Sequence, residues 1–349
     1  MKRKQGGARE GRYSRQLLLE NWKQEKLTAS KVLVVGIGAL GAAAATNLVA
    51  LGVGEITLVD FDTVEISNLN RQVLFRESDI GKAKVTVAAK HLKELNSDIK
   101  INQYNQDMRV LPKGVYESPK AILDCLDSFE DKRWLNSVCV ELKKPLIHGG
   151  MYGWYGNVQV VIPFKTPCLE CQPLIPPERL EKACTPPGKR RREEEQAAAT
   201  WQKQKIKKTK MPSISTVSTI IGGLQAQQTL KLIMGGEEAS LQSNYLFYDG
   251  RTESITKLEL QRNPNCIVCG EKYAVRTTEY AIDKDEDIRS LKDRLIMSWG
   301  LVEPIRAILN GQILQDNKKI GELHLGQGDA LYVYDRSMYK PMRLALKVQ

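Results

Sequence analysis

The chain has 349 residues, 42% of them hydrophobic, so it is long enough for two or three domains with substantial cores. Its formal net charge is +11, but residues 189–210 alone hold nine basic and three acidic residues, a net +6. Because more than half of the excess charge lies in one segment, a protein that coats nucleic acid is not expected. Trp201 is the single aromatic residue of that segment, too few for stacking bases.

The N-terminus is basic but has no apolar segment after it, so it does not have the pattern of a secretory signal. Four of the seven cysteines form CxxC pairs, which suits a reducing compartment and a metal better than a disulfide framework. Both features predict a cytoplasmic protein. The motif RYSRQ, residues 12–16, precedes an expected helix at Gln16–Trp22, and composition alone predicts that Arg12 and Arg15 are solvated charges.

Residues 31–62 have the pattern of a βαβ unit with a glycine-rich turn. Its expected parts are a buried strand at Val32–Val35, a turn with Gly36, Gly38 and Gly41, a helix at Ala42–Leu51, and a strand at Glu55–Val59 that ends on Asp60. The start of such a helix attracts phosphate, and a carboxylate after the second strand binds ribose. The pattern therefore predicts a nucleotide site, but it leaves NAD(P) and ATP open.

The uncharged run from residue 32 to residue 54 is also long enough for a membrane span. Its five glycines favour a buried unit of a parallel sheet instead, so no membrane association is expected.

Polar side chains follow the second strand, where the ligand crevice of an open α/β sheet lies. This cluster consists of Asn68, Asn70, Arg71 and Gln72. A helix expected from Gly81 to about Leu95 places Lys84 in its first turn. Two cations with several amides suit a triphosphate better than NAD.

A further strand is expected at Ala121–Leu126, with a helix at Phe129–Val140 behind it. Asp127 then lies at the end of a strand, where a carboxylate can hold Mg²⁺. Asp127 and Ser128 could equally form the N-cap of the following helix, and the two roles are compatible.

Two CxxC pairs lie in proline-containing turns, 95 residues apart. The four cysteines are Cys168, Cys171, Cys266 and Cys269. Four thiolates in two pairs are typical of a closed structural zinc site, and a redox pair is the less favoured alternative.

The other three cysteines differ in their surroundings. Cys125 lies in an expected strand and Cys139 on the apolar face of an expected helix, so both read as core thiols. Cys184 stands before the charged run, outside any strand or long apolar face, with Lys182 and Lys189 nearby. It is a candidate nucleophile, although an incidental surface thiol is the simpler alternative.

Residues 273–349 have the pattern of a separate C-terminal domain. The elements expected there are strands at Arg276–Ile282, Ile305–Ile313, Ala330–Tyr334 and Met342–Val348 and a helix at Asp287–Trp299. One helix on a small mixed sheet is a β-grasp-like pattern. Before this domain we expect strands at Pro145–His148, Asn157–Ile162, Tyr245–Asp249 and Ser254–Glu259, and a long helix at Pro212–Met234.

Over residues 12–272 the chain resembles the ubiquitin-like-modifier-activating enzymes and their bacterial adenylyltransferase relatives, the HesA/MoeB/ThiF superfamily. The motifs that carry the resemblance are RYSRQ, GIGALG, LVDFDTVEISNLNRQ, IGKAK, LDCLDS and the two CxxC pairs, in that order. The chain also resembles the catalytic subunit of the eukaryotic ubiquitin- and NEDD-type enzymes. It implies a Rossmann-like doubly wound adenylation domain, residues 1–272, with a catalytic-cysteine insertion, 183–211, and a C-terminal ubiquitin-fold domain.

The resemblance also implies roles for individual residues. Around the adenosine it places Gly38, Ala39, Gly41, Asp60 and Asp62, and near the phosphates Asn68, Asn70, Arg71, Gln72 and Lys84. Asp127 would hold the magnesium, and Ser128 would be a further cofactor-binding residue. Ala39 stands where the family usually has a third glycine, which could weaken ATP affinity. Arg15 would reach the triphosphate of a neighbouring subunit, which implies a homodimer.

The implied activity is ATP-dependent adenylation of the C-terminal carboxylate of a ubiquitin-like protein. Cys184 would then carry a thioester, and the C-terminal domain would hold a conjugating enzyme. A sulfur-carrier adenylyltransferase of the molybdopterin or thiamine type is the alternative, since it would use the same ATP residues. The implied cofactors are ATP, Mg²⁺ and Zn²⁺.

Overall fold

The computed structural model describes residues 11–171 and 212–348 apart from short gaps. The gaps are residues 242, 265, 267, 271–277, 300–304, 310–311, 324, 326–329 and 335–341. Cys184 and the basic run 189–210 lie outside the described residues.

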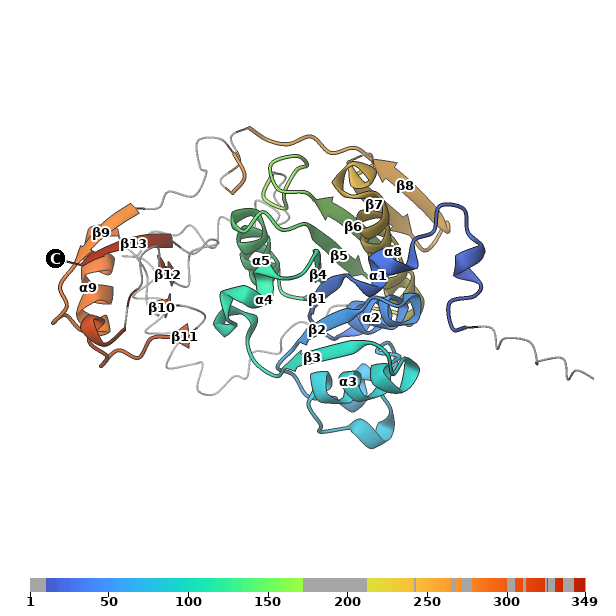
Figure 1. Ribbon diagram of the computed structural model, residues 1–349, viewed down its shortest axis with the longest axis horizontal. Coiled ribbons are helices and arrows are strands. Elements are labelled where there is room, and N and C mark those ends of the chain that lie inside the picture. The colour runs from blue at the N-terminus through green and yellow to red at the C-terminus, as the bar shows by residue number, and fades with distance from the viewer. Residues whose placement is uncertain are drawn as a thin grey trace, which may run out of the picture.

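An eight-stranded sheet forms the larger domain, with the strand order β3-β2-β1-β4-β5-β6-β7-β8 (Figure 1). The strands are β1 Lys31–Val35, β2 Glu55–Val59, β3 Lys100–Tyr104, β4 Ala121–Asp124, β5 Leu146–Tyr152, β6 Tyr155–Val161, β7 Tyr245–Asp249 and β8 Ser254–Leu258. Strands β1 to β5 pair in parallel, and the pairs from β5 to β8 are antiparallel. The predicted Rossmann-like sheet is therefore confirmed.

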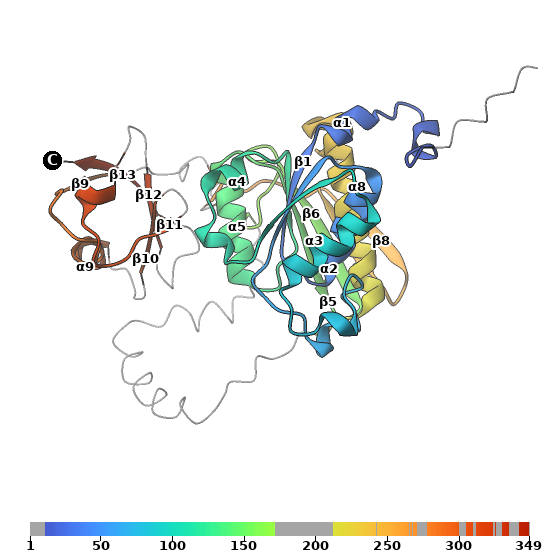
Figure 2. The ribbon, with the colours of Figure 1, turned by 60° about the horizontal axis from the view of Figure 1, so that its bottom comes forward.

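Helices cover both faces of this sheet, as the views in Figures 1 and 2 agree. They are α1 Gln24–Thr28, α2 Ala39–Leu51, α3 Lys84–Leu95, α4 Lys113–Glu117, α5 Phe129–Glu141 and α8 Ser215–Gly235. One buried cluster joins the sheet to α2, α3 and α8, and a second joins its other face to α4, α5 and the CxxC pairs. Sheets buried on both faces require near-continuous apolar strands, which explains the composition of β1 and β4.

Helix α8 packs closely on α2 because of a glycine. A Cβ atom on Gly222 would lie 2.7 Å from the Cβ of Ala43 and 2.8 Å from the carbonyl oxygen of Leu40. Because Gly222 has no side chain, the backbone of α8 lies directly against α2.

Two expected elements differ in the large domain. The predicted helix at Gln16–Trp22 is a short 3₁₀ helix at Gln16–Leu18, and α1 follows it. The strand predicted to run through Leu126 ends at Asp124, because the Asp124 carboxylate accepts a hydrogen bond from the Leu126 amide and turns the chain.

The C-terminal residues form a second sheet with the order β11-β10-β12-β13-β9 and one helix, α9 Ile288–Trp299. Its strands are β9 Thr278–Ile282, β10 Arg306–Leu309, β11 Gln312–Ile313, β12 Ala330–Tyr334 and β13 Met342–Val348. A helix on a small mixed sheet is the arrangement predicted, although the expected strand Ile305–Ile313 is two antiparallel strands. The domain has its own buried core, and its ubiquitin-fold assignment stays a prediction.

Candidate nucleotide site

The glycine-rich turn between β1 and α2 is built so that only glycine fits at two positions. Gly36 has φ +87°, and a Cβ on Gly41 would lie 1.9 Å from the carbonyl oxygen of Gly36. The turn therefore brings the backbone close to any ligand and opens a 13-residue helix whose positive end faces the same place. Ala39 is the first residue of α2 and is buried, so its methyl group is accommodated in the fold.

Asp60 braces this turn from the end of β2. Its Oδ2 accepts a hydrogen bond from the Ile37 amide at 2.7 Å, and its Oδ1 accepts one from the Asp62 amide at 2.8 Å. Burial raises the pKa of Asp60, and nearby Lys84 offsets part of that effect. Each carboxylate oxygen keeps a second lone pair, so the predicted bonds to ribose hydroxyls are compatible with the bracing role.

Some side chains of the polar cluster after β2 form hydrogen bonds within the loop, and others are left to contact a ligand. Asn68 is buried, and its Oδ1 accepts a hydrogen bond from the Glu65 amide at 3.0 Å. Arg71 Nη1 donates to the carbonyl oxygen of Ser67 at 2.8 Å and to Asn70 Oδ1 at 3.0 Å. These contacts fix the loop and hold the Arg71 guanidinium beside it.

Gln72 points from this loop to the glycine turn. Its Nε2 lies 3.8 Å from the position that a Cβ on Gly38 would occupy. Its Oε1 is buried and has no hydrogen-bond partner within the described part of the chain. A buried amide oxygen without a partner is costly, so a donor supplied by a ligand fits this place.

Lys84 lies in the first turn of α3, as predicted, although the helix begins at Lys84 and not at Gly81. Its side chain is buried, and Nζ lies 2.8 Å from Asp62 Oδ2. The ion pair brings two predicted site residues together and keeps a cation beside the loop that contains Arg71 and Gln72.

The predicted N-cap at the start of α5 is present. The Ser128 Oγ accepts a hydrogen bond from the Asp131 amide at 3.3 Å, and Asp127 is exposed directly before it. Mg²⁺ usually takes one or two protein carboxylates and completes its shell with water and phosphate oxygens. An exposed carboxylate at the carboxyl edge of the sheet fits that requirement.

A buried polar network beneath this turn was missed from the sequence. Its members are Asp124, Lys132, His148 and Gln225, all less than 6% exposed. His148 Nδ1 lies 2.7 Å from Asp124 Oδ2, and Lys132 Nζ lies 3.5 Å from Asp124 Oδ1. The signal that could have found it is that Asp124 and His148 both lie near the ends of expected neighbouring strands.

The network has a defined charge state. Burial by itself raises the pKa of Asp124, but the Lys132 charge and the His148 hydrogen bond lower it by more, so the pKa of Asp124 is lowered overall. Burial, and next the Lys132 charge, lower the pKa of His148. Near neutral pH the imidazole is therefore neutral and donates to an ionised Asp124.

Arg15 lies at the other end of α2 from the glycine turn. Within the same motif, Gln16 Nε2 donates to the carbonyl oxygen of Leu51, the last residue of α2. At 1.5 Å per residue, this 13-residue helix separates the two ends by about 20 Å. Arg15 therefore does not join the other predicted site residues of its own chain.

The four CxxC cysteines come together as predicted. All four are buried and their Sγ atoms lie within 4.8 Å of one another. The Cys168–Cys266 and Cys171–Cys269 sulfur pairs are 3.5 Å and 3.3 Å apart. Tetrahedral zinc with bonds of about 2.3 Å needs sulfurs about 3.8 Å apart, so the cluster fits zinc after a small expansion.

Helix α5 anchors the first CxxC pair. Asn136 Oδ1 accepts a hydrogen bond from the Leu169 amide at 3.1 Å, and the Arg133 guanidinium forms two bonds with the Glu170 carboxylate. Zinc would therefore stabilise the same helix whose first turn follows Asp127.

Cys125 and Cys139, which were predicted to be core thiols, are both buried. Burial raises the pKa of Cys125 to about 12 and raises the pKa of Cys139 strongly. Neither is suited to act as a thiolate nucleophile.

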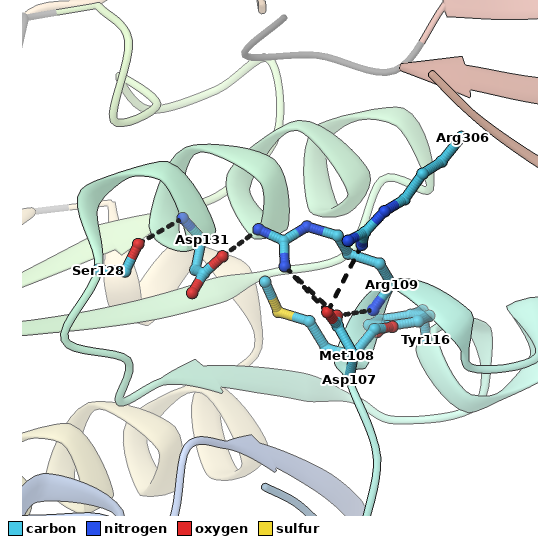
Figure 3. Close-up of polar contacts among 7 residues, drawn as sticks. All are labelled: Asp107, Met108, Arg109, Tyr116, Ser128, Asp131 and Arg306. Atoms are coloured by element: carbon cyan, nitrogen blue, oxygen red, sulfur yellow. Dashed lines mark hydrogen bonds and ion pairs between the residues drawn. The ribbon is translucent and has the colours of Figure 1, made fainter. Parts of the chain in front are cut away.

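On its outer side, the first turn of α5 is held by a set of charged residues (Figure 3). Arg109 forms ion pairs with Asp131 and, at 3.2 Å, with Asp107. Asp107 also lies 3.9 Å from Arg306 of the C-terminal domain. Figure 3 shows Arg109 between the two carboxylates, so α5 is tied to the loop after β3 and to the second domain.

None of the helices in the described part of the chain combines the length and apolar character needed to cross a membrane. This agrees with the interpretation of residues 32–54 as part of a sheet domain.

Comparisons with known proteins agree with this geometry. The sulfur carrier protein ThiS adenylyltransferase of Escherichia coli K12 is 32% identical over 265 residues, covering 74% of this chain and 94% of the relative. The SAMP-activating enzyme E1 of Haloferax volcanii is 33% identical over 266 residues, covering 74% of this chain and 88% of the relative. The MOCS3 adenylyltransferase and sulfurtransferase of Culex quinquefasciatus is 31% identical, but the match spans 81% of this chain and only 63% of the relative.

Solved structures agree as well. A crystal structure of E. coli MccB with ATP superposes with a TM-score of 0.59 at 25% identity, over 75% of this chain and 74% of that one. The model of the ThiF family matches residues 13–268, which include every described site residue named above except Arg306 and Cys269. The chain therefore belongs to the ThiF family, within the predicted HesA/MoeB/ThiF superfamily.

Proposed function

We propose that this protein adenylates the C-terminal carboxylate of a small ubiquitin-fold protein at the expense of ATP. The observation that carries the proposal is the glycine turn at the start of α2 with the buried Gln72 amide beside it, whose Nε2 lies 3.8 Å from the position of a Cβ on Gly38 and whose Oε1 has no partner among the described residues. Arg71 and Lys84 add positive charge on the same loop and the next helix. The adenylyltransferase relatives support the same reaction.

The reaction needs positioning and charge neutralisation more than acid–base catalysis. The carboxylate oxygen attacks the α-phosphorus of ATP, the bond to the β-phosphate oxygen breaks, and pyrophosphate leaves with its charge. A carboxylate is already a nucleophile at neutral pH, so no general base is required. Mg²⁺ held by Asp127 would neutralise charge on the phosphates, and Arg71 and Lys84 would stabilise the charge that develops on the leaving group.

A sulfur-carrier-type substrate is favoured over a dedicated ubiquitin-type modifier. The bacterial relative is named as a sulfur carrier protein adenylyltransferase and the insect relative as an adenylyltransferase and sulfurtransferase. The archaeal relative is named as a SAMP-activating enzyme E1. These names support a ubiquitin-fold protein with a free C-terminal carboxylate as the substrate class.

Thioester formation on Cys184 is a second step that the chain could add to adenylation. The other six cysteines are buried, four of them in the zinc-type cluster. An acyl transfer to a thiol of this chain would therefore use Cys184, which lies outside the described residues. The C-terminal domain would then hold a conjugating enzyme.

Pyrophosphate exchange tests the first step. With ATP, Mg²⁺ and the small ubiquitin-fold proteins of the same organism, one of them should support exchange of labelled pyrophosphate into ATP. The same carrier with an amidated C-terminus is the control and should be inactive. Equal exchange with the amidated carrier would contradict the proposal.

The Cys184→Ala variant separates the two steps. Exchange should persist in this variant, whereas a thiol-labile adduct with the carrier should disappear. If the unsubstituted protein forms no such adduct but exchanges pyrophosphate, the chain is an adenylyltransferase alone.

We also propose a symmetric homodimer in which Arg15 reaches the nucleotide of the other subunit. Its own glycine turn lies at the far end of α2, and the adjoining Leu17, Leu18 and Leu19 are 58%, 77% and 57% exposed. Three neighbouring exposed leucines are expected where a second subunit covers the surface. Mixing Arg15→Ala subunits with Lys84→Met subunits should restore exchange, and a monomeric mass with full activity would overturn this arrangement.

A further inference from the structure

A buried ion pair brackets the turn that presents Asp127. Asp124 ends β4 and Lys132 lies in the second turn of α5, so the pair closes the chain segment with Asp127 at its centre. Lys132 Nζ is 3.5 Å from Asp124 Oδ1 and donates to the carbonyl oxygen of Gly149 at 2.9 Å. The Leu126 amide donates to the same Asp124 oxygen at 3.1 Å. Both sides of the turn are thereby tied to one carboxylate.

Neighbouring elements hold this carboxylate in place. His148, on β5, donates to its other oxygen at 2.7 Å. Gln225, on α8, donates to the carbonyl oxygens of Asp124 and Ile147 at 2.9 Å and 3.0 Å. A Cβ on Gly149 would lie 2.5 Å from the Gln225 side chain, so the strand and the Gln225 side chain are closely packed at this position.

Structural stability alone does not require such a cluster, because apolar side chains of similar size would fill the space at no greater cost. What the ion pair adds is a fixed direction for the backbone between its two ends. Asp127 is exposed in that segment, and it is the carboxylate that we assign to Mg²⁺.

We propose that Asp124, Lys132 and His148 are positioning residues that aim Asp127 at the metal of Mg·ATP. The inference rests on the proposed function, since it presumes that ATP binds with its metal at this edge of the sheet. Residues that orient a metal ligand typically change metal affinity by about 10- to 100-fold when they are replaced. Their loss should therefore weaken metal-dependent binding of ATP and leave metal-independent binding nearly unchanged.

The test compares ATP binding by calorimetry in Mg²⁺ and in EDTA. The variants are Asp124→Asn, Lys132→Met and the double variant, which removes both buried charges and so protects folding if a single variant fails. Lys120→Met is the matched control, an exposed lysine just before β4. Zinc content and melting temperature check that each variant is folded.

We expect the Kd of ATP in Mg²⁺ to rise about tenfold or more in the positioning variants, with less than a twofold change in EDTA. In pyrophosphate exchange, saturating Mg²⁺ should restore most of kcat. Equal losses in Mg²⁺ and EDTA, or no loss in either, would overturn the positioning role. If the unsubstituted protein binds no ATP, the proposed function fails as well. If it binds ATP and the variants bind ATP with an unchanged Kd, only this inference is overturned.

Discussion

Lys84 shows how one residue can prepare a site for phosphate. A buried ammonium group loses its hydration, and here the Asp62 carboxylate at 2.8 Å compensates for that loss. Because Asp62 remains 56% exposed, its own hydration is largely kept, and Lys84 can turn to a more strongly charged partner at little cost. A triphosphate is such a partner.

Replacing Lys84 with methionine should therefore slow pyrophosphate exchange by about 100-fold, the order seen when one electrostatic contact to a developing charge is lost. Lys90→Met on the exposed face of the same helix is the control and should retain activity. An unchanged rate in the Lys84 variant would remove this residue from the phosphate site.

His148 predicts how stability depends on pH. Its pKa is lowered in the folded protein, so the unfolded chain binds a proton first as the pH falls below about 6.5. The contribution of His148 to the free energy of unfolding is therefore complete above about pH 6.5 and is lost as the pH falls toward the lower pKa of the folded protein. Asp124, whose pKa is also lowered, loses its contribution only below about 3.8. Burial raises the pKa of the Cys125 thiol to about 12, so it stays neutral in this range.

Denaturant titrations of the unsubstituted protein and His148→Asn between pH 7.5 and 5.5 measure this effect. The free energy of unfolding should fall more steeply with acid in the unsubstituted protein, by up to about 1.4 kcal/mol per pH unit. Both proteins contain the same cysteine cluster, so their difference isolates the imidazole. Parallel curves would show that His148 does not titrate on unfolding.

At the scale of single residues, the sequence predicted groups with a local signature. The glycine turn, Asp60 and Lys84 follow strand and helix boundaries that are visible in the chain. The Asp124–His148–Lys132 network was missed because its members are brought together by the pairing of β4 with β5 and by the packing of α5. Lys132, in a charged stretch of sequence, looks like a solvated lysine until α5 is placed.

At the scale of elements, α5 connects the parts of the site. Its first turn follows Asp127, its middle holds the first CxxC pair through Arg133 and Asn136, and its last residue, Glu141, accepts a hydrogen bond from Tyr332. A displacement of the cysteine cluster should therefore also move the first turn of the same helix, which follows the proposed magnesium ligand Asp127.

Zinc removal tests this connection. Cys269→Ser should lose bound zinc and lower the melting temperature by several degrees, because three thiols without a metal leave the loop around Leu169 unsupported. Cys184→Ser is the control and should keep one zinc per chain by atomic absorption. Full zinc content in the Cys269 variant would contradict the four-sulfur site.

Element boundaries show the limits of sequence reasoning in another way. The strand predicted at Ile305–Ile313 is two antiparallel strands, and the Asn310-Gly311 pair between them in the sequence is a typical turn signal that the prediction passed over. The last strand, β13, lies between β12 and β9, pairing in parallel with β9 and antiparallel with β12. Alternation within a strand cannot specify its neighbours, so this order could only come from the structure.

At the scale of the whole molecule, the C-terminal domain contacts α5 and the loop after β3. Arg306 lies 3.9 Å from Asp107, and the Tyr332 hydroxyl donates to Glu141 at 2.8 Å. The Tyr332 contact lies at the last residue of α5, and Figure 3 shows Arg306 beside Asp107, the partner of Arg109.

These contacts are weak enough to be broken during a reaction cycle. An exposed ion pair contributes at most about 1 kcal/mol and a single hydrogen bond about 1 kcal/mol. The double variant Arg306→Glu with Tyr332→Phe should therefore increase the population of undocked C-terminal domains about tenfold or more. It should raise the radius of gyration in X-ray scattering without changing the zinc content.

Lys318→Glu, an exposed charge reversal elsewhere on the same domain, is the control and should leave the scattering curve unchanged. If the double variant scatters like the unsubstituted protein, other contacts determine how the two domains are arranged.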